Sequence, residues 1–85
     1  MTFLGNRLMK YPSGSEIHRG DEVIFSDGSI GVVVIAIDFA AYSSGFSSEE
    51  WSYLETGVMV LSQVAGLIHY AAEPVEFELV RRIES

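Results

Sequence analysis

The feature that most limits the fold of this chain is the stretch GDEVIFSDGSIGVVVIAID, residues Gly20 to Asp38. Within it, Asp27-Gly28 separates a short apolar segment from eight consecutive apolar or glycine residues, Ile30 to Ile37. Asp-Gly between two apolar segments is the strongest short-range signal for a β-hairpin. The second strand is rich in β-branched residues and apolar on both faces, which predicts a central position. A membrane helix needs roughly 20 apolar residues, so this segment is too short to be one.

The second half of the chain predicts more strands. Its last apolar segment alternates apolar with charged residues, which is the period of a strand with one buried face. We expect strands at 22–25, 30–38, 57–63, 66–71 and 75–83. Gly31 indicates a bulge or a close backbone approach. About five short antiparallel strands in 85 residues predict one domain, 1–85, that is mainly β and forms a small SH3-like barrel.

Residues 39–56 interrupt the strands and form an insert. Ser47 and Glu50 have the spacing of a capping box at the start of a helix. The spacing predicts one or two helical turns from Ser48 to about Leu54. Such a short helix is unstable in isolation, so it must dock on the sheet.

Charge is distributed unevenly along the chain. The net charge is −7, and no lysine or arginine lies between Arg19 and Arg81, an interval that contains ten acidic residues. Such a surface repels phosphate, so we expect no binding of nucleic acid. It favours a basic protein as partner. The alternative is that the acidity only keeps a small protein in solution.

The sequence contains few of the residue patterns that are typical of enzymes. There is no cysteine, and His18 and His69 have no second ligand at a metal-binding spacing. No serine lies in a G-x-S-x-G turn. We therefore expect no catalytic residue, no metal and no cofactor. A Ser-His-Asp site assembled in space stays open, as does a ligand pocket under the insert.

The insert is the predicted partner-binding site. Five of the ten aromatic residues of the chain fall between Phe39 and Tyr53, close to several carboxylates. Interfaces concentrate binding energy in aromatic anchors surrounded by polar groups. The predicted site residues are Asp38, Tyr42, Phe46, Glu49, Glu50, Trp51, Tyr53 and Glu55. The alternative is that Trp51 and Leu54 are the buried face of the helix and close one end of the barrel.

Two resemblances rest on particular residues. The segment from Gly20 to Asp38 resembles the opening of KOW-like and SH3-like barrels, which begin with Gly-Asp, a short strand, a glycine turn and a strand starting with Gly and Val. The matching residues are Gly20, Asp21, Val23, Gly28, Gly31 and Val32. Many KOW-like proteins bind RNA or ribosomal partners through basic loops, whereas the matching segment here is acidic. The resemblance implies, as an alternative function, an accessory domain that contacts RNA or the transcription and translation machinery.

A wider pattern resembles small bacterial barrel proteins, some of which look like immunity proteins of polymorphic toxin systems. The segments that carry it are YPSG (11–14), GDEV (20–23), AIDFAAYSSGFSSEEWSYLETGVMV (36–60) and GLIHY (66–70). This resemblance implies a non-catalytic protein that neutralises a cognate toxin by binding it. The first ten residues contain no long apolar segment, so we expect no secretory signal and a soluble, cytoplasmic protein. Whether it forms a homo-oligomer stays open.

Overall fold

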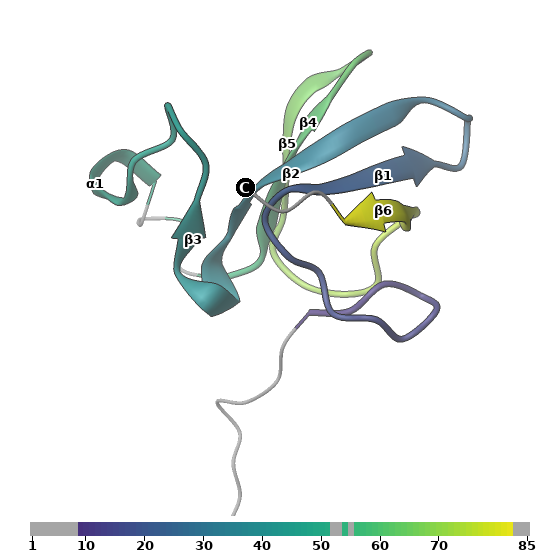
Figure 1. Cartoon of the computed structure of the whole chain (residues 1–85), viewed down its shortest axis with the longest axis horizontal. Helices are drawn as coiled ribbons and strands as arrows, with labels where there is room; N and C mark the ends of the chain where they lie inside the picture. The colour runs from purple at the N-terminus through teal and green to yellow at the C-terminus, as the bar shows by residue number, and fades with distance from the viewer. Residues whose placement is uncertain (1–8, 52–53, 55, 83–85) are drawn as a thin grey trace, which may run out of the picture.

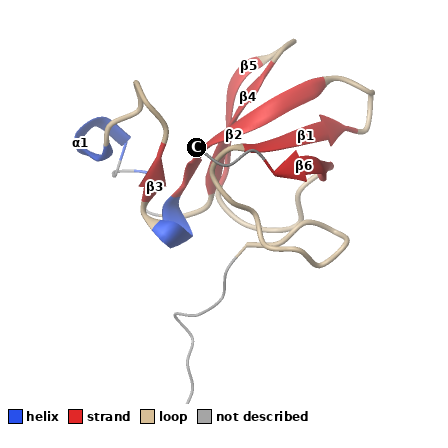
Figure 2. Cartoon of the chain, in the orientation of Figure 1, coloured by secondary structure: helices blue, strands red, loops and turns tan. Residues whose placement is uncertain are grey.

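The computed structural model describes residues 9–51, 54 and 56–82, and it is mainly β (Figures 1 and 2). The strands are β1 (Asp21–Phe25), β2 (Ile30–Ala36), β3 (Ala41–Tyr42), β4 (Val58–Ser62), β5 (Gly66–Tyr70) and β6 (Phe77–Arg82), with a 3₁₀ segment at Ile37–Phe39 and a short helix α1 at Ser48–Trp51. They form one antiparallel sheet in the order β5-β4-β2-β1-β6, and β3 pairs with β2. The predicted fold class is confirmed, with the two-residue β3 as an addition.

The predicted hairpin joins β1 to β2. The backbone NH of Gly28 donates to the carbonyl of Phe25 at 2.9 Å, and Gly28 has a φ of 90°, which favours glycine. Gly31, opposite Val23, marks a close approach rather than a bulge. A Cβ there would lie 2.9 Å from the ring of Phe25 and 3.0 Å from the carbonyl oxygen of Leu61. The irregularity in β2 comes later, between Val33 and Ile35.

The main core lies inside the curved sheet. It contains Val23, Val33, Val58, Val60 and Phe77, each almost completely buried. At the two ends of the sheet order, the ring of Tyr70 in β5 meets the ring of Phe77 in β6 edge-on, with 5.0 Å between ring centroids. Within the described ranges these two strands share no backbone pairing, so side chains close this barrel.

A second, smaller apolar cluster explains why β2 is apolar on both faces. Val34, Ile35 and Met59 are buried on the other side of the sheet, where the insert covers them. Tyr42, Phe46, Trp51 and Leu54 are the insert residues that pack against this cluster. The expectation that the insert docks on the sheet is therefore confirmed.

The helix of the insert, α1, is a single turn over the described residues Ser48–Trp51, where one or two turns are predicted. Ser47 caps it: its side-chain oxygen accepts a long hydrogen bond from the NH of Glu50 at 3.4 Å, and its carbonyl oxygen accepts from Glu50 and Trp51 at 3.1 Å each. The predicted end near Leu54 involves residues 52, 53 and 55, which lie outside the description. No helix in the described ranges is long and apolar enough to cross a membrane.

Candidate functional site

The insert lies on one side of the sheet, away from the β1–β2 and β4–β5 turns (Figure 1). Tyr42 comes from β3, Phe46 from the following loop and Trp51 from α1, and all three side chains are half-buried. The rings of Phe46 and Trp51 are 6.1 Å apart between centroids. The structure therefore gives these aromatics a packing role on the second cluster. Their use in binding stays a prediction, for which each of the three residues keeps a partly exposed surface.

Of the four acidic residues in the predicted site, the structure describes the side chains of two. Glu49 and Glu50 are exposed in the first turn of α1, and neither is within 4 Å of a basic side chain among the described residues. Asp38 belongs to the 3₁₀ segment, but its side chain is not described. Tyr53 and Glu55 lie wholly outside the description. The described part of the predicted site is thus two free carboxylates beside three partly exposed rings.

A buried polar cluster around Asp21 is absent from the sequence-based prediction. The Asp21 side chain is completely buried and accepts four hydrogen bonds. The donors are the Tyr11 hydroxyl at 2.6 Å, the His18 backbone NH at 2.9 Å, and Nε and Nη2 of Arg82 at 2.8 and 3.1 Å. This cluster ties the segment before β1 to the end of β6.

The hydrogen bonds decide the ionisation of this cluster. Burial alone would raise the pKa of Asp21, but the bonds from Arg82, Tyr11 and the His18 backbone outweigh it, and the pKa lies below its ordinary value. Burial first, and then the bond to Asp21, raise the pKa of the Tyr11 hydroxyl far above its ordinary value. Asp21 is therefore a structural anion paired with Arg82, and it is not accessible to a partner.

These contacts correct the expectation that all ten acidic residues between Arg19 and Arg81 lack a basic partner. Asp21 and Glu22 belong to the ten acidic residues that the sequence leaves unopposed, yet Arg82 and Arg81 pair with them, the second pair at 2.7 Å. The pairing of β1 with β6 brings together groups that are 59 and 61 residues apart in the chain. The pairs also occupy two of the basic residues, so other exposed carboxylates have no cation within 4 Å in the described part of the chain. These are Asp27, Glu49, Glu50, Glu73 and Glu76.

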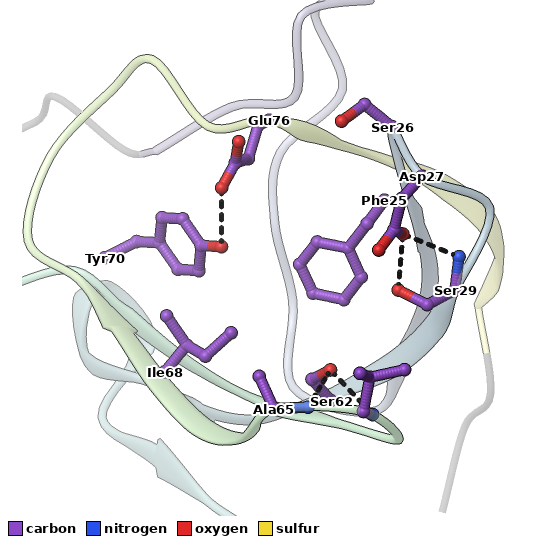
Figure 3. A pocket seen from close by; sticks show the side chains of 10 residues that line it. Phe25, Ser26, Asp27, Ser29, Ser62, Ala65, Ile68, Tyr70 and Glu76 are labelled. Carbon is purple, nitrogen blue, oxygen red and sulfur yellow. Dashed lines mark hydrogen bonds between the residues drawn. The ribbon is translucent and has the colours of Figure 1, made fainter.

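A pocket of about 210 Å³ opens at the end of the sheet that carries the β1–β2 and β4–β5 turns (Figure 3). Its lining residues are Phe25, Ser26, Asp27, Ser29, Ser62, Val64, Ala65, Ile68, Tyr70 and Glu76. The Tyr70 hydroxyl donates a long hydrogen bond of 3.4 Å to Glu76. This pocket lies away from the insert, so the alternative of a pocket under the insert is not tested by it and stays a prediction. Sequence reasoning missed it because its residues come from three segments far apart in the chain.

Neither histidine lines this pocket. The ring of His18 stacks on Phe39 at 4.3 Å between centroids and lies 3.3 Å from a Glu16 oxygen. The ring of His69 contacts the carbonyl oxygen of Thr56 at 2.9 Å. The pocket therefore has serines and carboxylates but no imidazole to act as a base. Among the residues that the structure covers, no three histidine or acidic side chains are grouped as a metal site.

Comparison with known proteins gives no relative for this chain. No family model, no curated protein and no solved structure matches it.

Proposed function

We propose that this protein is a non-catalytic binding module that acts as an immunity protein, neutralising a cognate cationic toxin by direct binding. The observation that carries the proposal is the surface of the insert, where Glu49 and Glu50 are exposed with no basic side chain within 4 Å among the described residues, beside partly exposed aromatic rings. Carboxylates of this kind accelerate encounter with a basic surface and pair with its lysine and arginine side chains.

The packing of the insert supports the same proposal. Tyr42, Phe46 and Trp51 are held against Val34, Ile35 and Met59, so their exposed edges are already positioned before a partner arrives. Ordering mobile side chains costs roughly 0.5–1.5 kcal/mol each on association, and side chains that are already packed lose less. A rigid aromatic surface flanked by carboxylates would occlude a basic active site without a conformational change.

The test is a binding titration against a cationic toxin domain encoded by the adjacent gene. We expect a stoichiometric complex at low salt whose affinity falls as salt is raised. The E49Q/E50Q variant should bind at least about tenfold more weakly, mainly through slower association. The matched control is E73Q/E78Q, which removes the same charge away from the insert and should bind as the unmodified protein does.

Two results would oppose the proposal. The first is the lack of any complex at low salt. The second is measurable affinity for RNA that falls with salt, which would instead favour the accessory domain of KOW-like type that contacts RNA or the transcription and translation machinery.

A further inference from the structure

We propose that the pocket at the β-turn end of the sheet is a binding site for a single cationic side chain, a lysine or an arginine of a protein partner. This inference rests on the proposed function in one respect: it assumes that the cationic group belongs to a protein partner. The pocket is separate from the insert, since it lies at the end of the sheet that carries the β1–β2 and β4–β5 turns (Figures 1 and 3).

Two aromatic rings form apolar walls of the pocket. Phe25 and Tyr70 both line it, and each ring packs edge-on against Phe77, with 5.5 and 5.0 Å between ring centroids. Phe77 is 1% exposed and holds both rings in place from within the core. A cation within about 6 Å of such a ring face is attracted to it, and the attraction increases when water is excluded. The walls suit the aliphatic chain and the charged end of a long basic side chain.

Two carboxylates supply the negative charge. Asp27 accepts hydrogen bonds from the side chain and the backbone NH of Ser29 at 2.7 and 2.9 Å, and these bonds lower its pKa, so it stays ionised. Glu76 is exposed, and its contact in the pocket is the 3.4 Å bond from Tyr70. Among the residues that the structure describes, no lysine or arginine lines the pocket. The carboxylates therefore lie at an aromatic hollow without an internal cation.

The size of the pocket limits what it can hold. Its volume of about 210 Å³ is below the roughly 300–1,000 Å³ of sites that enclose whole ligands and cofactors. A single side chain fits this scale better than a nucleotide does. Glu76 would also repel phosphate groups.

A neighbouring groove explains why a protein segment is the favoured source of the cation. The groove has a volume of about 470 Å³ and shares Phe25, Ser26 and Glu76 with the pocket. Most of its other lining is apolar, with Ile24 and Val75 among its residues. A polypeptide that inserts a basic side chain into the pocket would place its neighbouring apolar residues in this groove, which a small free amine could not use.

The experiment is an NMR titration of the isotope-labelled full chain with Nα-acetyl-lysine methylamide and Nα-acetyl-arginine methylamide. With at least one of the two probes, we expect saturable changes in the chemical shifts of the backbone amides of Ser29, Ile68 and Tyr70. The uncharged probe Nα-acetyl-norleucine methylamide should cause none. The E76Q variant should bind the charged probe about five- to tenfold more weakly, because it loses one charge-assisted contact.

The matched control is E50Q, which changes the net charge equally at the insert and should bind the probe as the unmodified protein does. Three results would overturn the inference. The first is chemical-shift changes with the norleucine probe that equal those with the charged probes. The second is an affinity for the charged probe that falls as much in E50Q as in E76Q, and the third is the lack of saturable changes with either charged probe. Tighter binding of putrescine than of the capped amino acids would overturn the assignment to a protein side chain. These outcomes do not depend on the toxin complex, so the two proposals can fail separately.

Discussion

The carboxylate of Asp21 accepts two hydrogen bonds from the guanidinium group of Arg82, although 61 residues separate the two in the chain. Asp21 begins β1 and Arg82 ends β6, so the pair fixes the register between the strands that join the two ends of the domain. Arg82 also donates to the backbone carbonyl of Glu16 at 2.8 Å. The N-terminal segment that carries Tyr11 is thereby held against the barrel.

We predict that Asp21→Asn lowers the free energy of unfolding by about 3 kcal/mol. Four donor groups converge on the two oxygens of Asp21, and an amide replaces one of these acceptors with a further donor. Chemical denaturation at pH 7 measures the effect. Arg81→Ala is the control, because the Arg81 side chain is 71% exposed and its pair with Glu22 should contribute less than about 1 kcal/mol. Similar losses in the two variants would contradict the structural role of Asp21.

The same carboxylate predicts a dependence of stability on pH. The pKa of Asp21 in the folded protein lies below its ordinary value of 3.8, so the folded state binds the proton less readily than the unfolded state does. Its contribution to stability is fully present above about pH 4 and is lost as the pH falls through the lower, folded-state pKa. The difference in unfolding free energy between the unmodified protein and Asp21→Asn should therefore shrink below pH 4. A difference that stays constant down to pH 2 would show that the charge of Asp21 is not the cause.

Local patterns in the sequence predict most of this fold. The Asp27-Gly28 turn and the alternation after Pro74 depend on neighbouring residues alone. The hairpin is where its pattern places it, and β6 begins at Phe77, two residues after the predicted start. Val75 and Phe77 are buried and Leu79 packs on the core, as predicted. The predicted end of the helix near Leu54 is not tested, because residues 52, 53 and 55 lie outside the description.

The polar features could not be predicted in the same way. Nothing near Asp21 in the sequence indicates that Arg82 will reach it, so the sequence counts a buried anion as surface charge. The pocket likewise depends on the curvature that brings the β4–β5 turn close to Glu76. For the insert, the sequence leaves open whether the aromatics pack or bind, and the structure shows that Phe46 and Trp51 pack while remaining partly exposed.

We predict that Gly57→Ala prevents stable folding or lowers the free energy of unfolding by more than about 2 kcal/mol. Gly57 has a φ of 97°, and an added Cβ would overlap the carbonyl oxygen of Tyr70. Gly45→Ala is the control: its φ is 89°, yet no heavy atom lies within 4 Å of the added Cβ. Only the backbone strain then remains, roughly 1–2 kcal/mol. Thermal unfolding of both variants measures the contrast, and equal losses would contradict the close approach at Gly57.

We predict that Trp51→Ala lowers the free energy of unfolding by about 1–2 kcal/mol, because the indole is half-buried against Val34, Ile35 and Met59. Glu49→Gln, in the same helical turn but exposed, should change stability by less than about 0.5 kcal/mol. Circular dichroism during urea unfolding reports both. An unchanged stability in Trp51→Ala would mean that the ring does not pack on the sheet and serves only at the surface.

Finally, we predict that the protein does not retain single-stranded RNA at 150 mM salt, where non-specific binders have dissociation constants of roughly 10⁻⁴–10⁻⁶ M. The physical reason is that Arg81 and Arg82 are already paired with Glu22 and Asp21, so they are poorly placed to release counterions from phosphates. Fluorescence anisotropy with a labelled oligouridylate measures this. The E22Q variant is the informative comparison, because it frees the exposed Arg81 and should raise any residual RNA affinity. Firm RNA binding by the unmodified protein would show that its acidic surface does not govern its choice of partner.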